Sequence, residues 1–334
     1  MSPLLESLRA IVNRTSMNLR RDVRSRNGLI FIAASLLALP LPLFVGGYTL
    51  GIMMQMLIFI VVVASWIFIA GYFGMFTFAH AALYGIGAYA TAILAAEVGV
   101  PPLLAIALGG VAAGIFCIPI AYPVIKLSGA YVAMVTLAYA EIIYHGTVIF
   151  RDLTGGPTGY TGFGQLFGGD RVMMFYFVLL FTVVSCIAMY AMLVNRFGLV
   201  ARAIRDSEDA AQMLGNNTPR YKLYGFLIGS MIAGMAGGLQ AYNVLLVSPP
   251  MLELDRMIEF MAMGIIGGLR LLSGAVFGTV IVYGLQEFLR AFGDFRLLIW
   301  GALLIIVILF VPNGFAGMKT KEKVRRLRDR FGDD

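Results

Sequence analysis

Long apolar runs, separated by short polar stretches, make up most of this chain. A helix needs roughly 20 consecutive apolar residues to cross a bilayer. Runs of about that length cover residues 28–46, 48–70, 78–97, 101–125, 129–150, 171–194, 223–246 and 294–312. The pattern therefore predicts an all-α polytopic membrane protein with about eight full transmembrane helices.

One further apolar segment, residues 257–290, is too long for a single crossing and is interrupted by small residues. The basic N-terminus and the basic tail are both expected in the cytoplasm. The chain must therefore cross the membrane an even number of times in total, and since the other runs give eight crossings, this segment must cross an even number of times, as two short helices or a re-entrant pair. Broken backbone at membrane depth is tolerated only where protein or a water-filled cavity covers it. The segment is therefore a candidate gate of a transport pathway, through Gly264, Gly267, Gly268 and Gly274.

A second glycine-interrupted region, residues 71–89, shows a faint likeness to the first. Gly74, Ala81 and Tyr89 recur at matching offsets as Gly268, Ala275 and Tyr283. Paired broken segments are typical of duplicated transporter folds, whose sites lie at the interface of the repeats. The pairing adds Gly74 to the candidate gate, although a chain so rich in glycine and alanine also produces such matches by chance.

Composition and charge agree with a membrane location. Hydrophobic residues make up 60 % of the chain and charged residues 13 %, whereas soluble domains average roughly a quarter charged residues. The net charge of +7 arises from Lys and Arg gathered at the two ends and in one central segment. This placement follows the positive-inside rule and argues against nucleic acid as a partner. We therefore expect a basic cytoplasmic arm (1–27), a transmembrane domain (28–312) and a basic cytoplasmic tail (313–334).

Residues 195–222 form the only long, charge-dense segment between the two basic ends. The crossings that precede this segment place it in the cytoplasm. Ser207 is a suitable N-cap and Gly215 a suitable terminator, so a short helix is predicted between them. Ala210 and Ala211 give this helix a small surface against which another protein can pack closely. The alternative is an ordinary solvated loop.

Residues 151–164 are predicted to form a glycine-rich loop on the opposite side of the membrane. Successive glycines allow tight turns and close approach of the backbone to another surface. The Thr, Tyr and Pro content of the loop favours defined turns over a flexible linker.

Catalysis has little support in this sequence. The two histidines, His80 and His145, lie far apart, and the chain contains no phosphate-binding Gly-Lys-Ser/Thr loop. Cys117 and Cys186 lie in apolar runs and are expected to be core residues. Glu141, inside the fifth run, fits the outer membrane interface and a transport pathway equally well. We therefore predict no catalytic residue, no metal and no cofactor bound by this chain.

Several segments, taken in order, carry a resemblance to one family. They are residues 74–89, 127–142, 153–159, 202–206, 209–215, 233–238, 264–268 with Ser273-Gly274, and 312–317. Together they are similar to the permease subunits of bacterial ABC importers for branched-chain amino acids, a family that also contains urea and short-amide permeases. Asp209-Ala-Ala-Gln-Met-Leu-Gly215 resembles the Glu-Ala-Ala-x-x-x-Gly signature of importer permeases. It has Asp in place of Glu and lacks the Leu-Pro that often follows.

The resemblance implies that the segment 195–222 contains a coupling helix that docks on an ATPase subunit. The residues implicated are Arg202, Arg205, Asp209, Ala210, Ala211 and Gly215. The implied partners are a homologous second permease subunit, two ATPase subunits that bind the ATP, and a periplasmic substrate-binding protein facing residues 151–164 and 247–256. The implied location is the bacterial inner membrane, with both termini cytoplasmic.

The expected function is therefore to form the path of an importer for branched-chain or other small apolar amino acids. Candidate pathway residues are polar or aromatic residues on broken or apolar segments: Thr77, His80, Tyr84, Tyr89, Thr136, Tyr139, Gln240 and Asn243. Urea, short amides and other small solutes are alternative substrates. An ion-coupled secondary transporter that acts alone is the alternative of a different class. It would require buried acidic residues, of which the apolar runs offer few.

Overall fold

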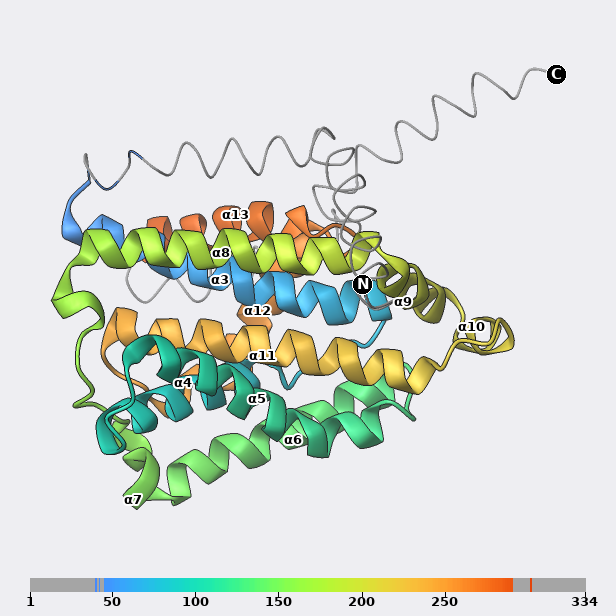
Figure 1. The fold of residues 1–334 in the computed structure, drawn as a ribbon, viewed down its shortest axis with the longest axis horizontal. Helices are drawn as coiled ribbons and strands as arrows, with labels where there is room; N and C mark the ends of the chain where they lie inside the picture. Colours follow the sequence, from blue (N-terminus) through green and yellow to red (C-terminus); the bar gives the residue numbers. More distant parts are fainter. Residues whose placement is uncertain (1–39, 41, 43–44, 291–300, 302–334) are drawn as a thin grey trace, which may run out of the picture.

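The computed structural model describes residues 45–290 together with Pro40, Pro42 and Gly301. Its long helices are α3 (Gly47–Phe73), α4 (His80–Glu97), α5 (Pro102–Val124), α6 (Ala130–Ile149), α8 (Arg171–Val194) and α11 (Thr218–Val244). The shorter helices are α7 (Arg151–Thr154), α9 (Arg196–Asp206), α10 (Glu208–Met213), α12 (Leu254–Gly267) and α13 (Ser273–Leu289). Three 3-10 turns are η2 (Gly156–Thr158), η3 (Leu166–Gly169) and η4 (Pro249–Met251). The long helices run roughly side by side (Figure 1).

Each apolar run within the described residues forms helix, so the all-α prediction is confirmed. The segment 257–290 forms two short helices, α12 and α13, as an even number of crossings requires. The runs 28–46 and 294–312 lie almost wholly outside the described residues, and the arm 1–27 and the tail 313–334 lie wholly outside them.

Five of the described helices, α3, α5, α6, α8 and α11, are long and apolar enough to cross a membrane. Helix α4 matches the predicted span 78–97 but is not among these five, and α12 and α13 are shorter, at 14 and 17 residues. No strand occurs within residues 45–290. These helices make the protein an all-α polytopic membrane protein.

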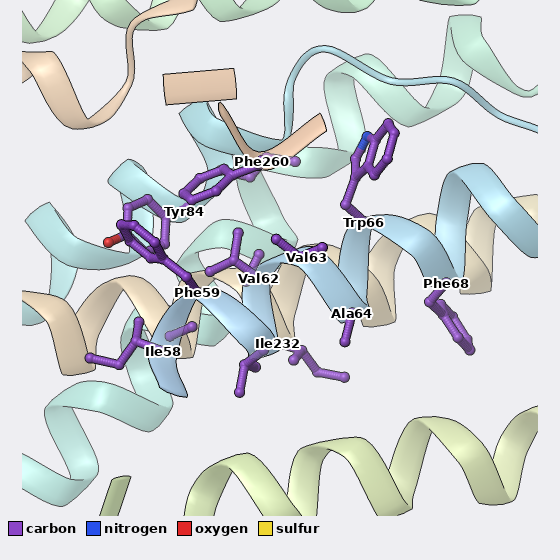
Figure 2. Close-up of a cluster of buried hydrophobic side chains, with 14 of the residues drawn as sticks. Ile58, Phe59, Val62, Val63, Ala64, Trp66, Phe68, Tyr84, Ile232 and Phe260 are labelled. Carbon is purple, nitrogen blue, oxygen red and sulfur yellow. The ribbon is translucent and has the colours of Figure 1, made fainter. Parts of the chain in front are cut away.

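Helix α3 forms the centre of the bundle. Its sequence is apolar on every side, which is typical of a helix surrounded by other helices. Every residue from Ile58 to Phe73 is buried, and α8, α11, α12 and α13 pack around it. Figure 2 shows Phe59 of α3 beside Tyr84 of α4 and Phe260 of α12, with the Phe59 and Phe260 rings edge to face at 5.2 Å.

The ends of the helices sort into two groups at opposite ends of the bundle. Each group is joined by hydrogen bonds between segments far apart in sequence. At the end that carries α10, Arg205 donates to the carbonyl oxygen of Gly71 (3.0 Å) and Lys222 donates to that of Ile125 (3.4 Å). At the end that carries α7, the hydroxyl of Tyr160 donates to Glu97 (2.8 Å) and that of Tyr48 donates to Glu287 (2.8 Å). Successive long helices therefore alternate in direction, as the crossing count predicts. Residues 195–222 and 151–164 lie at opposite ends (Figure 1).

Candidate coupling and translocation sites

A short helix, α10, projects from the bundle between α9 and α11 (Figure 1). The Ser207 hydroxyl accepts a hydrogen bond from the backbone N–H of Ala210 at 3.4 Å, which caps the start of the helix. Helix α10 ends at Met213, and Gly215 follows with φ +80°, a conformation that glycine adopts at little cost. The short helix predicted between Ser207 and Gly215 is confirmed.

Only part of the predicted Ala–Ala surface of α10 is exposed. Asp209 and Ala210 face outward, whereas Ala211 is fully buried in the protein's own interior. Met213 and Leu214 are 88 % and 79 % exposed, although side chains of this kind are among those most often buried. We call Asp209, Ala210, Met213 and Leu214 the α10 tip. Sequence reasoning missed its two apolar members, which are signalled by an apolar pair directly before the terminating glycine.

Arg205 ties α9 to the end of α3. Its guanidinium donates to the carbonyl oxygen of Gly71 at 3.0 Å and forms an ion pair with Asp206 at 2.9 Å. Gly74 lies against the same side chain, because a Cβ atom at Gly74 would be 3.0 Å from Arg205 Cγ. Arg202, one turn earlier, is partly exposed. Arg205 therefore makes its principal contacts within the chain.

An ion pair holds α10 against α11. Lys222 Nζ lies 2.5 Å from Glu208 Oε2 and also donates to the carbonyl oxygen of Ile125 at 3.4 Å. Thr218 donates to the other carboxylate oxygen of Glu208 at 3.2 Å, and Gln212 donates to Thr218 at 2.9 Å. Sequence reasoning missed this network because its side chains lie on two different helices that only packing brings together, and because Ile125 is 97 residues away from Lys222. The available signal was a lysine directly before the apolar run that begins at residue 223.

The candidate gate glycines bring α12 and α13 together, backbone against backbone. A Cβ atom at Gly267 would lie 1.8 Å from the carbonyl oxygen of Gly274, and one at Gly278 would lie 1.8 Å from that of Met263. Gly264 packs closely against α3, where its neighbour is the side chain of Trp66 rather than backbone. Close approach of this kind is the usual role of small residues between membrane helices.

The two glycine-interrupted bends lie in contact with each other. Gly74 follows α3 with φ +74°, and Gly268 follows α12 with φ +109°. A Cβ atom at Gly71 would lie 1.9 Å from the carbonyl oxygen of Leu269, so the link after α12 rests directly on the end of α3. The matching offsets in the sequence thus correspond to two glycine bends, of which the one at Gly74 also lies against Arg205.

Three candidate pathway residues brace the bend between α3 and α4. The Thr136 hydroxyl accepts a hydrogen bond from the backbone N–H of Phe78 at 2.9 Å, and the carbonyl oxygen of Thr77 accepts one from an indole N–H of α3 at 3.0 Å. His80 is fully buried, with its Nε2 atom 2.8 Å from the Ser65 hydroxyl. All three are therefore held by contacts within the bundle.

The other candidate pathway residues are spread along the bundle. Tyr84 packs edge to face on an aromatic ring of α12, and the Tyr139 hydroxyl donates to a backbone carbonyl of α5. Tyr89 Oη and Gln240 Oε1 are buried and have no hydrogen-bond partner among the described residues. Asn243 lines a small recess between α3, α8 and α11 at the α7 end. These residues thus lie along α4, near the middle of α6 and at the α7 end of α11.

The loops at the α7 end form one structured surface, the outer platform, made of residues 151–164 and 247–256. The backbones of Tyr160 and Val247 pair as an antiparallel bridge, with N···O distances of 2.7 and 3.0 Å. The Tyr160 hydroxyl also donates to Glu97 at 2.8 Å. Burial, together with this carboxylate, raises the pKa of the Tyr160 phenol. The defined turns expected in the loop are present, and the loop is joined to the second segment.

Helix α6 carries two ionisable side chains on its exposed side. Glu141 and His145 approach to 3.7 Å, and their side chains are 46 % and 66 % exposed. Ionisable groups that face lipid from a spanning helix are costly. This face of α6 therefore differs from an ordinary lipid-facing surface, and it suits water or another protein.

Comparison with known proteins decides the family. The family model for the permease component of branched-chain amino acid transport systems matches residues 48–311, which is most of the chain. The chain belongs to this family. The resemblance expected from the sequence motifs is therefore confirmed, and the protein is a multi-pass membrane permease.

Individual relatives agree with this family. The chain is 26 % identical over 318 residues to the high-affinity branched-chain amino acid transport system permease protein LivM of Escherichia coli K12, over 87 % of this chain and 75 % of LivM. It is 28 % identical over 283 residues to LivH of the same organism, over 76 % of this chain and 89 % of LivH. It is 26 % identical over 278 residues to BraD of Pseudomonas aeruginosa, over 76 % of this chain and 90 % of BraD. No solved structure matches the chain significantly.

Proposed function

We propose that this chain is the membrane-spanning subunit of an ATP-driven importer for branched-chain or other small apolar amino acids. The family and the names of LivM and LivH support this substrate class. Two separate ATPase subunits bind and hydrolyse the ATP, a homologous second permease completes the pathway, and a periplasmic binding protein delivers the solute to the outer platform. The protein lies in the bacterial inner membrane, with both termini in the cytoplasm.

The observation that carries the coupling role is the exposure of Met213 and Leu214 on a projecting, capped helix. A short helix with an apolar end can lie in the groove of a partner protein, which removes those side chains from water. On this proposal the α10 tip enters the ATPase groove, Gly215 ends the docking helix, and Arg202 lies at its margin. Ala211 and Arg205 support the docking helix from inside.

The pathway is proposed to run along α4, α6 and α11, where the candidate pathway residues lie. Its gate is formed by the two contacting glycine bends after α3 and α12. The exposed Glu141–His145 pair supports this assignment, because it favours water or the second permease over lipid next to α6.

Replacing both apolar residues of the α10 tip tests the coupling role. Met213→Glu with Leu214→Glu is expected to weaken co-purification of the ATPase subunits by about tenfold or more, because carboxylates lose affinity in an apolar groove. Insertion and folding of the chain should be unchanged, since both side chains are exposed. Val98→Glu is the matched control, because Val98 is 66 % exposed at the opposite end. Unchanged association in the double variant would remove the coupling role.

Reconstitution separates the proposal from its alternatives. Leucine uptake into liposomes should require the ATPase subunits and ATP. Uptake by this chain alone without ATP would identify a secondary transporter instead. Competition by urea or acetamide, without competition by isoleucine or valine, would identify the small-amide alternative.

A further inference from the structure

We infer that the Glu208–Lys222 ion pair transmits movement of α10 to α11 and α5, and so couples ATP hydrolysis to solute movement. The inference rests on the proposed function, because it requires an ATPase subunit docked at the α10 tip. Glu208 and Lys222 are positioning residues. Neither belongs to the α10 tip or to the candidate pathway, and each acts through the helices that it joins.

The Lys222 ammonium group holds three helices at one point. Lys222 is 5 % exposed, and a buried charge is tolerated only with partners in good geometry. Its partners are the Glu208 carboxylate at 2.5 Å, at the start of α10, and the Ile125 carbonyl oxygen at 3.4 Å, directly after α5. Lys222 itself lies on α11. One side chain thus joins α10, α11 and α5.

The Glu208 carboxylate is held on both oxygens. Lys222 occupies Oε2, and the Thr218 hydroxyl donates to Oε1 at 3.2 Å. Gln212, from the other end of α10, donates to the same Thr218 hydroxyl at 2.9 Å. These bonds form a chain of side chains from Lys222 through Glu208 and Thr218 to Gln212, and the chain links α10 to the first turns of α11. A tilt of α10 therefore either moves α11 with it or breaks charged hydrogen bonds, which are among the strongest in proteins.

Helix α11 contacts α4, a helix that carries candidate pathway residues, so a movement of α11 would reach the proposed pathway. Helix α11 packs along α3, α4 and α5 and carries Gln240 and Asn243 near its far end. A second contact, from Arg205 to the carbonyl oxygen of Gly71, joins α9 to the end of α3 beside the glycine bends. The segment 195–222 is thus connected both to α11 and to the candidate gate.

A double variant without either charge distinguishes a loss of coupling between α10 and α11 from a loss of folded protein. Glu208→Gln alone or Lys222→Met alone leaves one charge without its partner, so each single variant is expected to lower the amount of folded chain. Glu208→Gln combined with Lys222→Met leaves no unpaired charge and should restore folding and ATPase association. We expect leucine transported per ATP hydrolysed, in the reconstituted complex, to remain about tenfold below the wild-type ratio. A wild-type ratio in the folded double variant would overturn the inference.

A charge exchange gives an independent test. Glu208→Lys with Lys222→Glu re-forms the α10–α11 pair with opposite polarity. It does not re-form the hydrogen bond to the Ile125 carbonyl oxygen, because a carboxylate cannot donate. The exchange should therefore restore part of the coupling and transport about threefold or more leucine per ATP than Lys222→Glu alone. Equal ratios would overturn the inference. The control is Lys126→Met, which removes an exposed cation next to Ile125. The Lys126 side chain contacts Tyr122, and its loss should leave the ratio unchanged.

Failure of the wild-type chain to co-purify ATPase subunits would instead contradict the proposed function itself.

Discussion

Single glycine positions determine how closely these helices approach one another. A Cβ atom at Gly237 of α11 would lie 1.9 Å from the carbonyl oxygen of Tyr84, and one at Gly87 of α4 would lie 2.2 Å from that of Gly234. Such distances leave no room for any side chain. Small residues allow membrane helices to approach closely and gain packing contacts. Each of these two positions is restricted to glycine because its neighbour is helix backbone, which cannot change rotamer as a side chain can.

We predict that Gly278→Ala destabilises the protein. The added methyl group would meet the carbonyl oxygen of Met263 at 1.8 Å, which forces α12 and α13 apart and costs about 1–3 kcal/mol or more. The midpoint of thermal unfolding in detergent should fall accordingly.

Gly284→Ala is the matched control for this variant, on the same helix. No described atom lies within 4 Å of a Cβ atom at Gly284. Equal unfolding midpoints for the two variants would show that the α12–α13 crossing does not limit stability.

At the scale of elements, α10 and the loops of the outer platform form surfaces of defined shape rather than flexible linkers. Helix α10, which carries the α10 tip, is capped by Ser207 and held by the Glu208–Lys222 ion pair. The outer platform is held by a backbone bridge between residues 160 and 247. Both surfaces therefore keep their shape before a partner binds, which lowers the entropy that docking has to remove.

We predict that Gly159→Ala weakens docking of the binding protein at the outer platform. A Cβ atom at Gly159 would lie 2.5 Å from the carbonyl oxygen of Val247, so the two loop segments would separate. The Kd for the solute-loaded binding protein should rise by about tenfold, while co-purification of the ATPase subunits stays normal.

The control for the outer platform is Gly162→Ala. Gly159 and Gly162 both have positive φ, +80° and +91°, but no described atom lies within 4 Å of a Cβ atom at Gly162. Backbone strain is thus common to both variants, and only Gly159→Ala meets a neighbour. Equal Kd values for the two variants would remove the outer platform from binding-protein recognition.

At the scale of the whole molecule, the alternating direction of the helices places the α10 tip and the outer platform at opposite ends (Figure 1). A single bundle therefore presents one surface to each side of the membrane. The basic residues near α10 follow the positive-inside rule, which supports the proposed cytoplasmic location of the α10 end.

Cysteine labelling tests this orientation. Thr158 at the α7 end and Met213 at the α10 end are both exposed, and the native Cys117 and Cys186 are buried and can be replaced by alanine. A membrane-impermeant maleimide should label Thr158→Cys in spheroplasts and Met213→Cys only in inside-out vesicles. The reverse result would contradict the proposed orientation.

Local patterns in the sequence predict every helix that the structure describes within the apolar runs. They also predict the Ser207-capped helix, the glycine bends and the turns of residues 151–164. These features depend on hydrogen bonds and backbone conformations within a few residues, which the local sequence controls. The family resemblance could be recognised for the same reason, since its motifs are short and occur in a fixed order.

Only the tertiary structure decides which apolar surfaces meet and which face outward. The interior of a membrane protein and the surrounding lipid are both apolar, so hydrophobicity does not reveal that α3 is central or that Ala211 is buried while Met213 is exposed. The Glu208–Lys222–Ile125 contact joins α10 and α11 to a carbonyl group 97 residues away from Lys222. Such a contact exists only once the helices have packed, because packing alone brings these groups together and removes water from around them.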